Sequence, residues 1–196
     1  MVKLIALNVL LEKQNYKRNA VELIPGEDSC FSDFNISDFS IPEYYKWFAG
    51  MDYDEEPLTD LNFKIQKLCY EYLSGKEDIL KIIYQSILPK TSRYRSGEYY
   101  TPDWLVEFSI ESSGYKGALN ETILDPCCGS GSFLFFAVNS FLEKNKTLSI
   151  NPNQILKLIW GFDINPLAVI SSKTNLLIAL RKFLPFKEKI KFNIYK

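Results

Sequence analysis

Apolar residues recur at helical spacing in the first part of the chain. In the stretch 61–73 they fall on one face of a helix, at Leu61, Ile65, Leu68, Cys69 and Tyr72. A repeat of three to four residues is typical of an amphipathic helix. Ser74 and Gly75 follow, and glycine readily takes the left-handed conformation found just beyond a helix end. The pattern predicts a helix that ends at about residue 73.

Two further stretches before residue 90 have helical patterns. The stretch 77–88 predicts a helix that stops at Pro89, because proline cannot continue a helix. The apolar run 4–11, which Asn8 interrupts, predicts a short amphipathic helix. No small-residue cleavage site follows that run, so it does not predict a signal peptide. We expect a helical N-terminal region over residues 1–90.

The hydrophobic pattern changes from about Glu121 onward, where short β-prone runs alternate with helical ones. The predicted order is a strand at 122–124, a helix at 133–142, a strand at 159–164, a helix from Pro166 to about Lys182, and a strand at 190–195. Strand–helix alternation is typical of a doubly wound parallel α/β sheet, in which ligands bind at the carboxyl ends of the strands. We expect residues 91–196 to form the first half of such a domain.

Composition narrows the class without identifying the function. The chain is 46% hydrophobic and 24% charged, as is usual for globular proteins, and no apolar run approaches the ~20 residues that cross a bilayer. The formal net charge is -1, but basic residues outnumber acidic ones after residue 88. A basic second half is compatible with a polyanionic partner such as DNA, although such a charge is common on ordinary surfaces.

Cysteine and histidine usage argues against a metal site. The sequence has 4 cysteines, no histidine and no C-x-x-C spacing, so it lacks the usual zinc ligand sets. Cys127 and Cys128 are adjacent, which suits a tight turn better than a disulfide framework. We expect reduced thiols and a cytoplasmic protein.

The first motif with chemical content lies between the predicted strand at 122–124 and the helix that follows. It runs Asp-Pro-Cys-Cys-Gly-Ser-Gly-Ser-Phe-Leu over residues 125–134. Gly129 and Gly131 allow a sharp turn and a close ligand approach, and Asp125 can hold a cationic amine. An ordinary tight turn is the alternative. Leu134 departs from the dinucleotide fingerprint, and the Gly-Lys-Ser/Thr of a phosphate loop is absent.

This motif resembles the S-adenosylmethionine motif D-P-x-C-G-S-G-x-F-L of amino-methylating DNA methyltransferases, in the subgroup that includes the modification subunits of restriction systems. Every fixed position of the pattern is matched. The resemblance implies S-adenosylmethionine as the cofactor. It also implies a cofactor-binding role for Asp125, Pro126, Gly129, Ser130, Gly131 and Phe133.

A second motif, Gly-Glu-Tyr-Tyr-Thr-Pro at 97–102, follows Arg93 and Arg95. Thr101 and Pro102 predict a helix start with a hydroxyl cap and proline at the first helical position, where free N–H groups can bind an anion. A capped helix with two packing tyrosines is the alternative. In the family this helix start meets the methionine carboxylate of the cofactor, so the resemblance gives that role to Tyr100, Thr101 and Pro102.

A third motif, Gly-Phe-Asp-Ile-Asn-Pro at 161–166, ends the second predicted strand. A carboxylate there can accept hydrogen bonds from two ribose hydroxyls. The alternative is that Asp163 or Asn165 only caps the helix that begins at Pro166, and we expect Asn165 to cap it in either case. By resemblance, Asp163 binds the ribose and Ile164 contacts the adenine of the cofactor, with Asn165 beside them. The resemblance covers about residues 83–182.

The catalytic loop of the family has no counterpart in the sequence. Adenine N6 methylation in these enzymes uses an Asn/Asp/Ser-Pro-Pro-Tyr/Phe loop that accepts the N6 hydrogens and stacks on the flipped-out base. No Pro-Pro pair occurs, and Asn151-Pro152 and Asn165-Pro166 lie at predicted helix starts. We therefore expect no catalytic residue in this chain, no methyl transfer by the chain alone, and weak cofactor binding by half a sheet.

The resemblance implies DNA as the substrate, restriction or specificity subunits as partners, and no membrane association. Three alternatives stay open from the sequence. The target amine can be adenine N6 or cytosine N4. The substrate can be protein glutamine or RNA, although the Asp-Pro-x-Cys and Tyr-Tyr-Thr-Pro elements favour DNA. The chain can also be a non-catalytic remnant that docks to a partner subunit.

Overall fold

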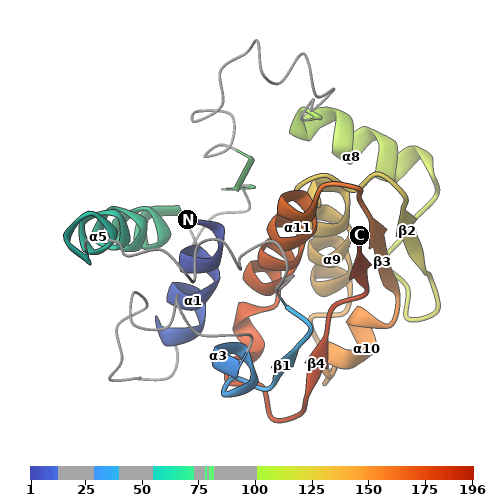
Figure 1. Ribbon diagram of the computed structural model, residues 1–196. Helices are drawn as coiled ribbons and strands as arrows, with labels where there is room; N and C mark the ends of the chain where they lie inside the picture. Colours follow the sequence, from blue (N-terminus) through green and yellow to red (C-terminus); the bar gives the residue numbers. More distant parts are fainter. Residues whose placement is uncertain (13–28, 40–54, 73–77, 79, 82–100) are drawn as a thin grey trace.

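The computed structural model describes residues 1–12, 29–39, 55–72, 78, 80–81 and 101–196 (Figure 1). The second part of the chain contains α8 (Asp103–Ser112), β2 (Ile123–Asp125), α9 (Ser132–Lys144), α10 (Pro152–Leu156), β3 (Ile159–Phe162), α11 (Pro166–Ala179), the 3-10 turn η1 (Arg181–Phe183), β4 (Ile190–Lys191) and β5 (Ile194–Tyr195). The first part contains α1 (Val2–Glu12), α3 (Ser29–Ser32), β1 (Ile36–Ser37) and α5 (Glu55–Tyr72). The predicted α/β class is confirmed.

The main sheet is parallel and has β3 between β2 and β5. Ile123 lies opposite Ile159, and Gly161 lies opposite Ile194. Parallel neighbours need a crossover connection, which α9 and α10 provide between β2 and β3 and which α11 provides between β3 and β5. The carboxyl ends of the three strands therefore lie at one edge of the sheet, and the turns after β2 and β3 are neighbours.

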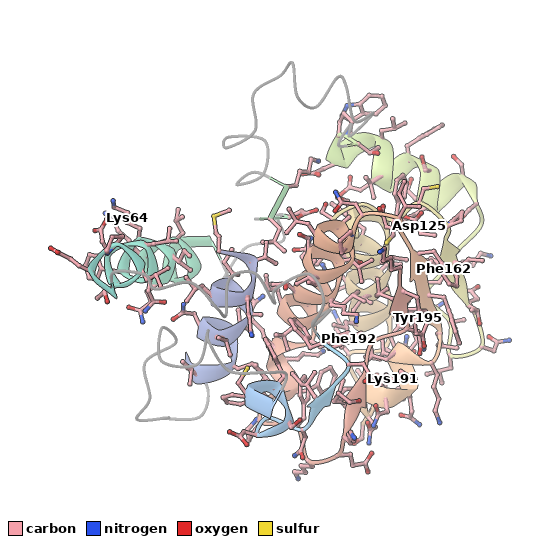
Figure 2. All side chains as sticks on the ribbon, viewed as in Figure 1. Lys64, Asp125, Phe162, Lys191, Phe192 and Tyr195 are labelled. Atoms are coloured by element: carbon pink, nitrogen blue, oxygen red, sulfur yellow. The ribbon has the colours of Figure 1, made fainter. Side chains whose placement is uncertain are left out.

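The two faces of this sheet differ in burial. Ile159 and Gly161 are buried on the face that α9 and α11 cover, whereas Trp160 and Phe162 are exposed on the other face. A Cβ at Gly161 would lie 2.8 Å from a methyl carbon of Leu134, so glycine lets α9 pack closely on β3. On the exposed face the ring centroids of Phe162 and Tyr195 are 5.9 Å apart (Figure 2).

Helix α11 lies at the centre of the helical layers. It packs between α9 and α1, and α5 packs against α1 on the outer side (Figure 1). Every residue from Val169 to Ala179 is buried as a result, polar ones included. The predicted helix from Pro166 is confirmed, but its regular part ends at Ala179 and the 3-10 turn follows.

Helix α1 is not the amphipathic helix that the run 4–11 predicted. Residues 2–10 are all buried, because α11 and α5 cover α1 from different sides. Asn8, which interrupts the apolar run, is buried too, and its side-chain N–H groups donate to Leu4 O at 2.9 Å and to Asn62 Oδ1 on α5 at 2.8 Å. The polar residue therefore joins two helices inside the core.

Helix α5 confirms the helix predicted over 61–73 and begins earlier, at Glu55. Two glutamates followed by Pro57 suit a first turn, where acidic side chains and proline are favoured. Ile65 is buried and Leu61 and Leu68 are partly buried, as the predicted apolar face requires. Of the helix predicted over 77–88, only residues 78, 80 and 81 lie within the described residues, and 80–81 are helical.

The strand predicted over 190–195 is divided between two sheets. β4 pairs in parallel with β1, with Ile36 opposite Ile190, whereas β5 pairs with β3. A segment far away in the sequence thus supplies the partner of β4, which no local pattern indicates. The domain division at residue 90 stays a prediction. No helix in the described residues is long and apolar enough to cross a membrane.

Candidate cofactor-binding site

The turn between β2 and α9 has the sharp geometry that its glycines predict. Gly129 has φ +53° and Gly131 has φ +86°, both in the left-handed region that favours glycine. The N–H of Gly131 donates to Cys128 O at 2.7 Å and closes the turn. Gly131 occupies the N-cap of α9, where no side chain caps the helix.

Gly131 lies in a crowded place, whereas Gly129 has open space beside it. A Cβ at Gly131 would lie 2.4 Å from Ser172 Oγ and 3.0 Å from Ser172 Cα on α11, so the second glycine permits the close approach of that helix. A Cβ at Gly129 would meet nothing within 4 Å. Gly131 therefore serves packing, whereas Gly129 borders open space in which a ligand can approach the backbone.

Asp163 joins the turn after β3 to the glycine turn. Its Oδ2 accepts from the N–H of Gly129 at 2.9 Å, and its Oδ1 accepts from the N–H of Asn165 at 2.8 Å. The N–H of Cys128 also donates to Phe162 O at 2.9 Å. Two of the three sequence motifs are therefore in direct contact. A carboxylate has about four lone-pair sites, so Asp163 can still accept bonds from a ligand.

Asp125 lies at the carboxyl end of β2 (Figure 2), half-buried, and its Oδ1 accepts from the N–H of Cys127 at 3.1 Å. Burial is the main cause that raises the pKa of Asp125; the bond from Cys127 opposes this rise, and the negative charge of Asp163 adds to it. Within the described residues, neither carboxylate forms an ion pair with a lysine or arginine. Two adjacent, uncompensated carboxylates favour a cationic ligand.

The other side chains of the first and third motifs differ in exposure. Ile164 is 91% exposed, unusual for an apolar residue, while Phe133 is half-buried. Ser130 is 3% exposed, and its hydroxyl faces the core. The side chain of Asn165 accepts from the N–H of Leu167 at 2.9 Å, which confirms that Asn165 caps α11. Asn151 caps α10 in the same way, as expected for a helix start.

The start of α8 differs from the prediction by one residue. Pro102, and not Thr101, occupies the N-cap, and no side chain caps the helix, so the predicted hydroxyl cap is wrong. The carbonyl of Pro102 accepts from the N–H groups of Leu105 at 2.9 Å and Val106 at 3.1 Å. Because proline's fixed φ suits both positions, the sequence did not separate them. Residues 93–100, including Tyr100, lie outside the described residues.

The sequence did not indicate that Asp78 contacts the first motif and that Lys81 contacts the second. Asp78 Oδ2 accepts from the hydroxyl of Ser132 at 2.6 Å, and Lys81 Nζ donates to Thr101 O at 2.6 Å. An aspartate three residues before Lys81, at the start of a predicted helix, is typical of an N-cap. That signal accounts for the bond from Lys81 N to Asp78 Oδ1 at 3.0 Å but not for the distant partners.

A cavity of about 610 Å³ adjoins this site on the side of α8. Its walls are the second half of α8, the loop after it and β2, and they include Asp125, Pro126 and Phe133. Gly129, Asp163 and Ile164 do not line it. The cavity therefore meets the carboxyl edge of the sheet at β2 and runs along that strand, away from the turn after β3.

The two cysteines of the glycine turn are free thiols. Cys128 is buried, and burial is the largest cause that raises the pKa of its thiol to about 12. A thiol with that pKa stays protonated at neutral pH and is a poor nucleophile or metal ligand. In the described part of the chain, no three residues of the metal-ligating types gather into a site.

Comparison with known proteins finds similarity to DNA methylases. A family model described as N-6 DNA Methylase matches residues 75–182. The type I restriction enzyme MjaIX methylase subunit of Methanocaldococcus jannaschii is 33% identical over 146 residues, which are 70% of this chain and 24% of that protein. The EcoEI methylase subunit of Escherichia coli is 30% identical over 97 residues, 49% of this chain and 19% of that protein. The chain spans about a quarter or less of these relatives.

Proposed function

Because the chain belongs to the N-6 DNA Methylase family, we propose that it binds S-adenosylmethionine at the turns after β2 and β3, as part of a DNA methyltransferase of a restriction-modification system. The proposed reaction is transfer of the cofactor's methyl group to adenine N6. The proposed domain is a doubly wound, Rossmann-like methyltransferase sheet, of which β2, β3 and β5 are neighbouring strands.

The pair Asp125 and Asp163 carries this proposal. Burial raises the pKa of Asp125, repulsion by the negative charge of Asp163 adds to that rise, and no lysine or arginine of the described residues pairs with either carboxylate. S-adenosylmethionine has an ammonium group and a sulfonium centre, so its binding relieves that repulsion. We assign Asp125 to the ammonium group and Asp163 to the ribose hydroxyls, which can use the lone pairs that its two backbone bonds leave free.

The neighbouring backbone supports the same assignment. Gly129 borders open space and permits close contact with the nucleoside, while Ile164 is exposed beside Asp163 and can cover the adenine ring. The start of α8 has no side-chain cap, so its free N–H groups can meet the methionine carboxylate. Thr101 and Pro102 would contact that end, with Tyr100 before them. Pro126 and Phe133 complete the proposed binding residues, and Ser130, Gly131 and Asn165 are proposed to contribute through their backbone, because Ser130 is buried, Gly131 packs against Ser172 and the Asn165 side chain caps α11.

Catalysis is proposed to require residues that this sequence does not contain. The family's Pro-Pro-Tyr/Phe loop makes N6 nucleophilic, and the sequence has no Pro-Pro pair. We propose that these residues supply cofactor binding and that methyl transfer depends on a segment carrying that loop. DNA and the specificity and restriction subunits of such systems are the proposed partners, in the cytoplasm.

Isothermal titration of the chain with S-adenosylmethionine tests the binding proposal. We expect saturable binding, and a loss of about tenfold in affinity for Asp163→Ala, equal to about 1.4 kcal/mol, because a charged hydrogen-bond acceptor is removed. Glu143→Ala is the matched control: this glutamate on α9 is exposed and pairs with Lys146. Absence of binding by the unaltered chain, or equal affinities for Asp163→Ala and the control, would contradict the proposal.

The substrate proposal needs an enzyme that also carries the Pro-Pro loop. Labelled S-adenosylmethionine should transfer its methyl group to DNA, and nucleoside mass spectrometry should find N6-methyladenine. Label on cytosine N4, RNA or protein glutamine would replace the proposed substrate while leaving the cofactor site intact. Methylation of DNA by the 196-residue chain alone would show that the Pro-Pro loop is not needed.

A further inference from the structure

Asp78 is a buried carboxylate whose bonds converge from separate segments. It is 2% exposed. Its Oδ2 accepts from the hydroxyl of Ser132 at 2.6 Å, and its Oδ1 accepts from Asn175 Nδ2 on α11 at 2.8 Å. The same Asn175 amide donates to Ser130 O at 2.8 Å, and the hydroxyl of Ser130 lies 3.4 Å from Asp78 Oδ2. Asp78 therefore holds the glycine turn through both of its serines.

Three residues further on, Lys81 contacts the start of α8. Its Nζ donates to Thr101 O at 2.6 Å and pairs with Asp103 Oδ1 at 2.5 Å, with the lysine side chain 11% exposed. The backbone N–H of Lys81 donates to Asp78 Oδ1 at 3.0 Å, so the two side chains have a fixed relation. Asp78 and Lys81 thus form a bracket between the glycine turn and the first residues of α8.

The charges of Lys81 and Asp103 affect how well the start of α8 can bind an anionic group. Asp103 lies in the first turn of α8, where its negative charge would oppose an anion at the helix start. Lys81 compensates that charge and fixes the carbonyl of Thr101. An unpaired buried carboxylate is unfavourable, so Asp78 in turn requires its donors in place. Both residues therefore act on groups that border the proposed pocket, and neither belongs to the motifs.

We infer that Asp78 and Lys81 are positioning residues that hold the glycine turn and the start of α8 in place for the cofactor. Asp78 acts through Ser130 and Ser132 on the turn that borders the nucleoside, and Lys81 acts through Thr101 and Asp103 on the end that meets the methionine carboxylate. This inference rests on the proposed function. It predicts that Asp78 affects binding of the nucleoside part of the cofactor and that Lys81 affects binding of its methionine part.

Titration of the full chain with S-adenosylmethionine and with 5′-methylthioadenosine separates the two roles, because the second ligand lacks the aminobutyrate part. Lys81→Met should weaken binding of S-adenosylmethionine about fivefold and leave 5′-methylthioadenosine unchanged. Asp78→Asn should weaken both about tenfold, as expected when a charge-assisted bond is lost. Lys64→Met is the matched control, because Lys64 pairs with Asp60 at 2.6 Å on the exposed side of α5.

For Lys81, a purely structural role predicts a different result: a lower unfolding temperature, with equal losses of affinity for both ligands. Equal loss of both ligands in Lys81→Met, or no loss in either bracket variant, would overturn the inference although the unaltered chain still binds cofactor. If the unaltered chain binds neither ligand, the proposed function fails and this inference with it.

Ser132→Ala provides a milder variant, in case the loss of the Asp78 carboxylate prevents folding. It deletes one donor to Asp78 and the 3.4 Å contact between the Ser132 and Ser130 hydroxyls, and it keeps the Asp78 carboxylate. Amide hydrogen exchange without ligand should be faster at Gly129 and Gly131 in this variant, and unchanged in Lys64→Met. Unaltered exchange at both glycines would show that Asp78 does not hold the turn.

Discussion

The two turns at the carboxyl edge of the sheet both connect a strand to a helix, but only one of them has a side-chain cap at the helix start. Each leads from a parallel strand into a helix on the same face of the sheet. The turn after β3 is capped by its own side chains, since Asn165 caps α11 and Asp163 accepts from Asn165 N–H. The turn after β2 has glycine at its N-cap, and no side chain caps α9. One turn is closed by bonds to its own side chains, whereas the other is closed by a backbone bond from Gly131 to Cys128 and leaves open space beside Gly129.

This difference indicates a division of roles between the two turns. The side-chain-capped turn provides a fixed carboxylate, Asp163, and extends it to the N–H of Gly129 in the other turn. The glycine turn provides the open space beside Gly129. A pocket for a nucleoside with a positive charge needs both contributions, and each can be removed separately by substitution.

The largest effect is expected from Gly131→Ala. The new methyl group would lie 2.4 Å from Ser172 Oγ, and alanine would have to adopt φ +86°. Left-handed strain and overpacking together should lower the free energy of unfolding by about 3 kcal/mol or more, measured by urea denaturation. Gly129→Ala, which adds a methyl group in open space, should lower it by about 1 kcal/mol. Equal losses would remove the distinction between the two glycines.

Gly129→Ala should have the larger effect on the ligand. Its methyl group would enter the space that we assign to the nucleoside, and we expect S-adenosylmethionine affinity to fall about tenfold, or 1.4 kcal/mol. Titration calorimetry at a temperature well below the unfolding transition measures this loss. An unchanged affinity in a folded Gly129→Ala chain would mean that the open space beside Gly129 is not the binding pocket.

Asn165→Ala tests the side-chain cap in the turn after β3. Loss of the bond to Leu167 N–H should lower the free energy of unfolding by about 1 kcal/mol, a typical value for an N-cap. Asn151→Ala at the start of α10 is the matched control and should have a similar effect, since Asn151 caps that helix through Asn153 N–H. We expect less than a threefold change in cofactor affinity, because the backbone N–H that Asp163 uses is retained. A loss of affinity as large as that of Gly129→Ala would show that the Asn165 side chain itself contacts the cofactor.

The smallest effect at neutral pH concerns the protonation of Asp125. Its pKa is raised, so the folded state holds this proton to higher pH than the unfolded chain does. A cationic ligand prefers the ionised carboxylate, so affinity should fall as pH falls through the raised pKa. Asp163→Asn removes the repulsion and should shift that fall to lower pH, measured by titration between pH 4 and pH 7 at ~1-unit steps. The same profile in both chains would show that the two carboxylates do not interact.

Features with a local cause were predictable from the sequence. Gly129 and Gly131 indicated a sharp turn because left-handed φ favours glycine, and Asn165 before Pro166 indicated a capped helix start. The parallel direction of the strands was predicted from the alternation of β-prone and helical runs. The same alternation predicted a candidate site at the ends of β2 and β3, because ligands of parallel sheets bind at the carboxyl ends of the strands.

Features that depend on distant partners were not predictable in this way. Residues 2–10 of α1 are buried on every side because α5 and α11 cover the helix, and the sequence of this run does not indicate which elements those are. β4 is separated from β5 because Ile36 and Ser37 pair with it from the first part of the chain. Asp78 had a local signal for its helix cap and none for Ser132 or Asn175. The Thr101 cap failed because proline suits the N-cap and the first helical position alike.

The location of the pocket can be tested directly by NMR titration of the labelled chain with S-adenosylmethionine. We predict that the largest amide shift changes occur at Gly129, Asp163 and Ile164, with smaller changes at the start of α8 and none along α5. Changes confined to Ser113 and Tyr115, which line the neighbouring cavity, or no changes at either turn, would contradict the account.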